Sequence, residues 1–267
     1  MAFCRSLNNV VLELMTQIPP NKKIYFLSDF HLGAPDHESS LVREKKVVAF
    51  LESIRKDAGL IFIVGDIFDF WYEYKKVVPK GFVRLLGKLA ELTDSGIPIH
   101  VFTGNHDMWM SGYFEEELNI PVYHAPKVFE FNNKRFLIAH GDGLGPGDNG
   151  YKFIKKIFRN RLCQWMFGQL HPTLGIGLAN YLSRKSRVKT GTSDEIFLGE
   201  TGEWLIIYCR QVLAKEHFDY FIFGHRHNAV DYKLSDTSRY INLGDWIRNF
   251  TYATFDGKDV ELKKWEG

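Results

Sequence analysis

The 267-residue chain contains only three cysteines and lacks any long hydrophobic run. Cys4, Cys163 and Cys209 are far apart, so their spacing predicts neither a disulfide framework nor a thiolate zinc site. The apolar runs are much shorter than the ~20 residues that a membrane-spanning helix requires. The first twenty residues lack a basic start, a continuous apolar segment and a small-residue cleavage site, so they do not predict a signal peptide. We therefore expect a cytoplasmic protein.

Short runs of branched and aromatic residues alternate with segments of helical spacing in the first half of the chain. Five such runs, each closed by polar or glycine-rich sequence, predict buried strands at 24–27, 60–64, 97–102, 135–139 and 220–223. Between the first three runs, residues 41–56 and 82–95 have helical spacing. Strands and helices in alternation predict a parallel sheet with covering helices, and hence an α/β fold.

The pattern changes after residue 139. Long helical stretches, roughly 151–182 and 195–215, precede further strands near Tyr220, Val230, Tyr240 and Thr251. We therefore expect a helical insertion at about 148–200 within a domain that covers residues 23–267. Residues 1–22 form a leader, and their sequence is compatible with a short amphipathic anchor, a packing helix or a disordered segment.

Polar side chains with metal-binding chemistry follow the predicted strands: Asp29, His31, Asp66, Asn105, His106, Asp107, His140, His225 and His227. Ligands bind at the carboxyl ends of the strands in open α/β sheets, so residues far apart in sequence can meet there. Carboxylate, amide and imidazole groups without a thiolate suit Mn²⁺, Mg²⁺, Fe²⁺ or Zn²⁺. The residue types favour a catalytic metal site over a closed structural one.

Each of these residues has an ordinary explanation when it is considered alone. A histidine at a strand end is often a satisfied polar side chain, and an aspartate after a strand often caps a helix. A whole cluster of unpaired carboxylates and imidazoles is costly to desolvate unless cations compensate it. Five glycines stand where the backbone must turn sharply or approach a ligand closely, and they favour the metal site: Gly33, Gly65, Gly104, Gly141 and Gly224.

Five motifs resemble, in order and spacing, those of the calcineurin-like metallophosphoesterases: Asp29-Phe30-His31, Gly65-Asp66-Ile67-Phe68-Asp69, Gly104-Asn105-His106-Asp107, His140-Gly141-Asp142 and Gly224-His225-Arg226-His227. The resemblance spans roughly residues 23–264 and implies a four-layer αββα sandwich. It also implies two divalent metal ions. The first would be held by Asp29, His31, Asp66 and His227. The second would be held by Asp66, Asn105, His140 and His225, with Asp66 as the bridge.

Such a pair of cations predicts the reaction class, hydrolysis of a phosphate ester or anhydride. Two cations about 3.5 to 4 Å apart can bind a phosphate, lower the pKa of a shared water and stabilise the charge that develops during in-line attack. His106 is expected to donate a proton to the leaving oxygen, or a hydrogen bond to the phosphoryl group, with Asp107 orienting its ring. The alternative for His106 is that it only orients a metal ligand.

The predicted insertion is basic and apolar at once. Residues 151–190 contain no Asp or Glu and nine basic residues: Lys152, Lys155, Lys156, Arg159, Arg161, Arg184, Lys185, Arg187 and Lys189. Apolar residues recur there at three- and four-residue steps, which predicts a basic amphipathic helical pair. A solvated charged face opposite a packed face is the ordinary interpretation. The absence of acids favours anionic lipid headgroups or a phosphorylated lipid, with single-stranded nucleic acid as a rival.

A narrower resemblance, to the UDP-2,3-diacylglucosamine pyrophosphatases of lipid A synthesis, comes from three segments. They are the run from Gly65 to Trp71, the segment Asp148-Asn149-Gly150-Tyr151, and the helical insertion that ends at Ser186-Arg187. The resemblance implies hydrolysis of a nucleotide-linked glycolipid to UMP and lipid X, under a helical cap that receives acyl chains. It implies substrate contacts at Asp148, Tyr151, Arg184, Arg187 and Lys189. His106 departs from it, since the better-known branch has arginine after the motif asparagine.

These resemblances imply a cytoplasmic, metal-dependent hydrolase, with Mn²⁺ as the expected metal. Its partners would be the glycolipid and, by peripheral contact, the anionic inner face of the cytoplasmic membrane. A phosphodiesterase or nuclease acting on a nucleotide or single-stranded nucleic acid is the alternative. A non-enzymatic scaffold is disfavoured because all seven ligand positions carry ligand-type residues.

Overall fold

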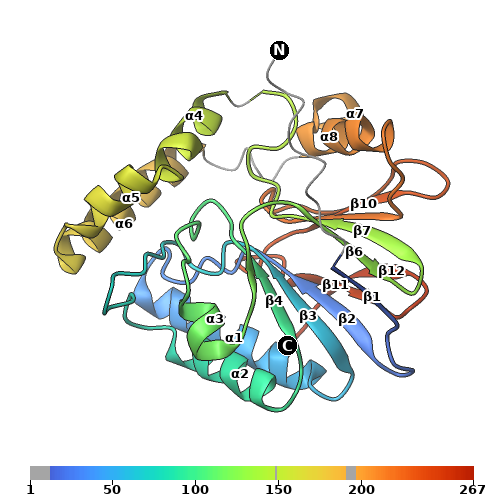
Figure 1. Ribbon diagram of the computed structural model, residues 1–267, viewed down its shortest axis with the longest axis horizontal. Helices are drawn as coiled ribbons and strands as arrows, with labels where there is room; N and C mark the ends of the chain where they lie inside the picture. The colour runs from blue at the N-terminus through green and yellow to red at the C-terminus, as the bar shows by residue number, and fades with distance from the viewer. Residues whose placement is uncertain (1–12, 148, 191–196) are drawn as a thin grey trace.

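Two six-stranded sheets, packed face to face, form the centre of the protein in the computed structural model (Figure 1). The structure describes residues 13–147, 149–190 and 197–267, with the backbone alone for 13–16 and 184–190. In order across the first sheet lie β1 (Glu13–Thr16), β6 (Lys127–Phe131), β7 (Lys134–Ile138), β8 (Tyr220–Phe223), β10 (Arg239–Leu243) and β9 (Ala229–Lys233). In order across the second lie β12 (Val260–Lys264), β11 (Thr251–Phe255), β2 (Lys23–Leu27), β3 (Ala58–Val64), β4 (Ile99–Phe102) and β5 (Val122–Tyr123).

Helices cover the outer face of each sheet, which gives four layers. The second sheet carries α1 (His37–Ile54), α2 (Val83–Asp94) and the short α3 (Tyr113–Leu118), and the first carries α7 (Gly199–Gly202) and α8 (Trp204–Leu213) (Figure 1). One apolar cluster fills the space between the sheets, and one lies under the helices on each outer side. The predicted αββα sandwich is confirmed.

Strand β2 shows why the sequences of the central strands are continuous apolar runs. Tyr25 and Leu27 pack into the cluster under α1 and α2, whereas Ile24 and Phe26 pack into the cluster between the sheets. A strand that is buried on both faces needs apolar residues at successive positions rather than at alternate ones. The strands β2, β3, β4 and β5 are parallel neighbours, so their carboxyl ends meet at one edge of the sandwich.

The predicted strands and amino-terminal helices are all present, with ends shifted by a few residues. The sequence interpretation did not identify α3, β5, β6 or β12. It also offered no strand for the leader, yet residues 13–16 form β1, which pairs in parallel with β6. Strand β1 has four residues and β5 has two, and such short elements carry too few positions for a periodic signal.

Residues 149–190 form three helices where the sequence suggested one helical pair: α4 (Asn149–Phe158), α5 (Arg161–Gly168) and α6 (Pro172–Thr190). We call these three helices the cap. Asn160 separates the first two, because its side chain accepts hydrogen bonds from the amides of Leu162 and Cys163 and so begins a new helix. Pro172 begins the third helix at a position that proline favours. The cap lies to one side of the sandwich, at the upper left of Figure 1.

Candidate metal centre

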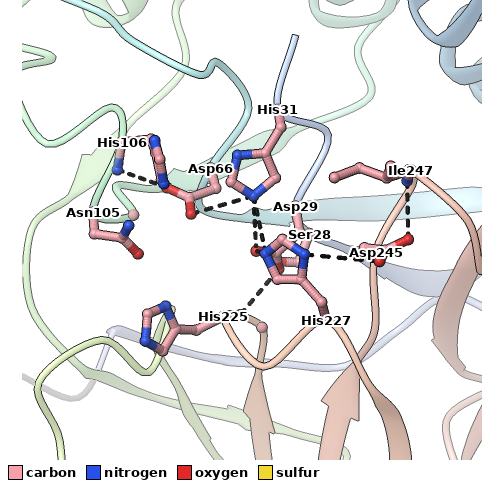
Figure 2. Close-up of polar contacts among 12 residues, drawn as sticks. Ser28, Asp29, His31, Asp66, Asn105, His106, His225, His227, Asp245 and Ile247 are labelled. Atoms are coloured by element: carbon pink, nitrogen blue, oxygen red, sulfur yellow. Dashed lines mark hydrogen bonds and ion pairs between the residues drawn. The ribbon is translucent and has the colours of Figure 1, made fainter. Parts of the chain in front are cut away.

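Seven side chains from five strand ends meet at one edge of the sandwich, and Figure 2 labels all of them except His140. From the second sheet, Asp29 and His31 follow β2, Asp66 follows β3 and Asn105 follows β4. From the first sheet, His140 follows β7, and His225 and His227 follow β8. The two sheets therefore both supply the cluster, and the fold brings together all seven residues that the sequence predicted as metal ligands.

The backbone at this edge adopts a conformation that ordinary residues avoid. Five of the seven residues have left-handed backbone angles, with φ of 58° at Asp29, 45° at His31, 52° at Asp66, 69° at His225 and 50° at His227. Such positions cost of order 1–3 kcal/mol each and persist where the surrounding structure enforces them, typically at functional sites. The concentration of strain here indicates that side-chain placement outweighs local backbone preference.

Two of the predicted glycines leave room for the carboxylates. A Cβ atom on Gly104 would lie 2.1 Å from Oδ1 of Asp66, and one on Gly224 would lie 2.4 Å from Oδ2 of Asp29. Both distances are far below van der Waals contact, so any larger residue would displace a ligand-type carboxylate.

The first group of ligand atoms comes from Asp29, His31 and His227. The Nε2 atoms of the two histidines are 3.1 Å apart, and Oδ1 of Asp29 lies 3.5 Å from Nε2 of His31 and 3.3 Å from Nε2 of His227. Among the described residues, this buried Oδ1 atom has no partner with hydrogen-bond geometry. Ligand atoms that are each about 2.0–2.2 Å from one ion lie ~3 Å apart, so the group fits a divalent cation.

The second group comes from Asp66, His140 and His225, with Asn105 beside it. Nε2 of His140 lies 3.2 Å from Oδ2 of Asp66 and 3.2 Å from Oδ1 of Asn105. Nδ1 of His140 lies 2.8 Å from the carbonyl oxygen of Val64, which only accepts, so Nδ1 donates and Nε2 is left to bind a metal. Oδ2 of Asp66 also lies 3.6 Å from Nε2 of His31, so this carboxylate lies between the groups.

The electrostatics of the cluster favour cation binding. Burial raises the pKa of Asp66, but the imidazoles of His140 and His106 outweigh it and hold that pKa well below the usual range. Burial lowers the pKa of His31 to about 3 and that of His225 to about 4. These two rings are therefore neutral at pH 7, as metal ligands must be.

His140 has the opposite shift. Burial opposes its charge, yet the neighbouring carboxylates of Asp66 and Asp29 raise its pKa to about 10. The negative charge of this pair is strong enough to hold a proton on a buried imidazole. A divalent cation compensates the same charge and displaces that proton, so metal affinity should rise with pH.

His106 lies at the margin of the cluster, and its surroundings differ from the expectation. Its Nδ1 atom lies 3.0 Å from the backbone oxygen of Asp69 and 3.4 Å from Oδ1 of the same residue. Asp107 was expected to orient this ring. Its buried carboxylate instead accepts from the amides of Ile67 and Gly104, at 2.7 Å each. Asp107 therefore joins two motif loops through their backbones, and Asp69 is the carboxylate beside the His106 ring.

The sequence interpretation missed three residues that support the cluster. Oδ1 of Asp69 lies 3.8 Å from Nδ1 of His31, the hydroxyl of Ser28 donates to Oδ2 of Asp29 at 2.5 Å, and Oδ2 of Asp245 lies 3.8 Å from Nδ1 of His227. Carboxylates and hydroxyls in such places orient metal-binding groups. Asp69 and Ser28 could have been found, since both are within or next to a quoted motif. Asp245 lies in none of the five motifs.

The structure describes the side chain of only one of the five predicted substrate-binding residues, Tyr151. The Tyr151 hydroxyl donates to Asp142, which also pairs with Lys155, so α4 of the cap contacts the loop that follows His140. Asp148 lies outside the described residues. Arg184, Arg187 and Lys189 lie on α6, in the part where the structure describes the backbone alone.

The sandwich, the seven-residue cluster and its strained strand ends agree with comparisons to known proteins. The family model of the calcineurin-like phosphoesterases matches residues 22–229, so the chain belongs to that family. This family uses a dinuclear metal centre. The predicted resemblance to calcineurin-like metallophosphoesterases is confirmed.

Curated relatives extend over nearly the whole chain. A UDP-2,3-diacylglucosamine hydrolase from Porphyromonas gingivalis is 40% identical over 257 residues, which cover 91% of this chain and 98% of the relative. Proteins of the same name from Aeromonas hydrophila and Pseudomonas putida are 27% and 26% identical, covering 83% and 91% of this chain and 90% and 99% of the relatives. The narrower resemblance expected from the sequence is thus confirmed by similarity along the whole chain.

Proposed function

We propose that this protein hydrolyses the pyrophosphate of UDP-2,3-diacylglucosamine and releases UMP and lipid X. The observation that carries the proposal is the 40% identity to a UDP-2,3-diacylglucosamine hydrolase over nearly the full length of both chains. The similarity extends over 257 residues, which is far beyond the five motifs.

Two divalent cations would be held at the cluster. Asp29, His31, Asp66 and His227 would hold the first, and Asp66, Asn105, His140 and His225 the second, with Asp66 shared. When bound, the two cations neutralise the phosphate oxygens and lower the pKa of a shared water. Mn²⁺ is the proposed metal, while Mg²⁺, Fe²⁺ and Zn²⁺ also suit these oxygen and nitrogen ligands.

His106 would supply the proton to the leaving oxygen. Its Nδ1 atom faces the backbone oxygen of Asp69, so the ring donates there and leaves Nε2 as the atom that can exchange a proton with substrate. Its backbone amide donates to Oδ1 of Asp66 at 2.9 Å, which fixes the residue against the bridging carboxylate. The better-known branch has arginine at this position, where this chain has His106.

The cap would bind the acyl chains. Eleven of the seventeen large hydrophobic side chains that are exposed among the described residues lie in α4, α5 and α6, and Leu170 lies between α5 and α6. The rings of Phe158 and Phe167 contact aromatic side chains of the sandwich, but neither α4 nor α5 has a buried residue. Most of their apolar surface is therefore not covered by a core, as the ordinary interpretation of an amphipathic helix requires. Exposed apolar surface of this extent is typical of sites that bind lipids, membranes or proteins.

The same surface would allow peripheral contact with an anionic membrane, since basic residues accompany the apolar ones. Among the described residues, none of the helices has the length and apolar character needed to cross a bilayer. Tyr151, Asp148, Arg184, Arg187 and Lys189 would contact the substrate.

The test is a comparison of four substrates with the purified protein in added Mn²⁺. We expect UMP release from UDP-2,3-diacylglucosamine to exceed, in kcat/KM, hydrolysis of UDP-N-acetylglucosamine, of bis-p-nitrophenyl phosphate and of single-stranded DNA. Faster cleavage of DNA would replace this proposal with the nuclease alternative. Equal rates on the acylated and unacylated nucleotide sugars would remove the acyl-binding role of the cap.

A further inference from the structure

Ser183 connects the cap to the side chains around His106. It lies on α6, and its hydroxyl oxygen is 3.2 Å from Oδ1 and 3.1 Å from Oδ2 of Asp69. The same oxygen lies 3.4 Å from Nδ1 of His106. Ser183 is 114 positions from Asp69 and 77 positions from His106 in the sequence. Its hydroxyl therefore brings helix α6 of the cap into contact with the histidine that is proposed to donate the proton.

The protons in this group can be assigned from the chemistry of each atom. The carbonyl oxygen of Asp69 only accepts, so Nδ1 of His106 donates to it across 3.0 Å. The Asp69 carboxylate accepts as well, so the single proton of the Ser183 hydroxyl is directed toward that carboxylate. The serine therefore fixes the carboxylate, and the carboxylate and carbonyl of Asp69 together fix the ring.

We propose that Ser183 is a positioning residue that makes proton donation by His106 depend on the seated cap. The inference rests on the proposed role of His106 and extends it to a residue outside the five motifs. When α6 is in place, its hydroxyl holds Asp69 against the ring and keeps Nε2 available for the leaving oxygen. When α6 moves away, Asp69 loses that donor and the ring loses one of its constraints.

The cap is also held to the sandwich at other points, which separates the effect of Ser183 from the seating of the cap itself. The hydroxyl of Tyr72 donates to the backbone oxygen of Gln164 at 2.8 Å, and Nε1 of Trp109 donates to that of Phe158 at 2.7 Å. These bonds hold α5 and the end of α4 without any contribution from Ser183. Removal of one hydroxyl from α6 should therefore leave the cap seated.

The experiment is a double-mutant cycle between Ser183→Ala and His106→Ala, measured on bis-p-nitrophenyl phosphate and on UDP-2,3-diacylglucosamine. Ser183→Ala should lower kcat about 3- to 10-fold, the scale of one hydrogen bond, with KM and metal content unchanged. In the His106→Ala background the same change should have no further effect. Ser183→Thr, which keeps the hydroxyl, should recover most of the turnover, and Thr173→Ala, which removes an exposed hydroxyl from the same helix, should match the wild type.

Three outcomes would overturn the proposal. A loss that persists in the His106→Ala background would show that Ser183 acts independently of His106. A rise in KM for the glycolipid without a fall in kcat would make Ser183 a substrate contact. An unchanged kcat in Ser183→Ala would show that the contact has no functional role. The Ser183 effect is the ratio of variant to wild-type kcat on one substrate. The wild-type rates on the two substrates therefore test the proposed function separately.

Discussion

The candidate metal centre buries its charged side chains, whereas the cap exposes both charged and apolar side chains. At the cluster, Asp29, Asp66 and His140 are buried, and the charges of carboxylates and imidazoles offset one another at short range. In the cap, nine basic residues have no acidic neighbour in sequence, and large apolar side chains are exposed. A buried, mixed-charge cluster suits a small divalent ion, whereas an exposed, basic and apolar surface suits an amphiphile. We therefore expect the cluster to carry out hydrolysis and the cap to select the substrate, and four predictions test this division of roles.

The largest effect is expected from Asp66→Ala. In the proposed centre the carboxylate of Asp66 would compensate two cations that otherwise repel each other, so hydrolysis of every substrate should fall by roughly 10⁴-fold or more and metal content should drop at both sites. Metal analysis of the purified variant and assays on the small phosphodiester and the glycolipid check this. Asp236→Ala, at an exposed turn, is the matched control. Two metals retained per chain in the Asp66 variant would refute the shared carboxylate.

His106→Ala should keep both metals and lose roughly 10²- to 10⁴-fold in kcat, the scale of a missing proton donor. The loss should be similar for the glycolipid and for the small phosphodiester if their leaving groups have similar pKa values, because the role proposed for His106 is in the chemical step and not in binding by the cap. The exposed His217→Ala provides the control. A fall in metal occupancy instead would place His106 among the residues that support the ligands.

Neutralisation of Arg184, Arg187 and Lys189 to glutamine should act on one substrate only. Each basic residue near an anionic surface contributes about 1 kcal/mol, so KM for the glycolipid should rise roughly 10- to 100-fold at low salt. Turnover of bis-p-nitrophenyl phosphate should remain close to that of the wild type. The difference between variant and wild type should shrink in high salt, because exposed charges are screened. An equal loss on both substrates would mean that the cap supports the stability of the sandwich.

The smallest effect is expected from a pair of glycines on α6. A Cβ atom at Gly175 would lie 2.3 Å from the hydroxyl of Tyr74 and 3.2 Å from the ring of Phe167, whereas one at Gly177 would meet nothing within 4 Å. Gly175→Ala should therefore shift the helix or the tyrosine and raise KM for the glycolipid by about 2- to 5-fold. Gly177→Ala should leave KM unchanged and stabilise the helix by up to ~1 kcal/mol. Equal behaviour of the two variants in kinetics and thermal unfolding would show that the position of α6 does not matter.

The sequence alone determined the layered α/β fold and the seven residues that meet at the strand ends. Both were predictable because buried strands need consecutive apolar residues, and because ligands in such sheets gather at the carboxyl ends of strands. The helical character of 149–190 was also predictable from apolar periodicity. Its division into three helices depended on Asn160 and Pro172, which are local signals that the broad periodic pattern concealed.

Tertiary structure decided which carboxylate stands beside His106. Asp107 is adjacent in sequence, but the close backbone approach of two motif loops places amides where its carboxylate can accept from them. Asp69 reaches the ring from another strand end, and Ser183 reaches Asp69 from the cap. His106 is 37 positions from Asp69 and Ser183 is 114 positions from it, so these contacts depend on how strands and helices pack. The periodicity within one helix or strand gives no information about such contacts. The sequence therefore specified the residues of the cluster, and only the packing of the two sheets and the cap specified their neighbours.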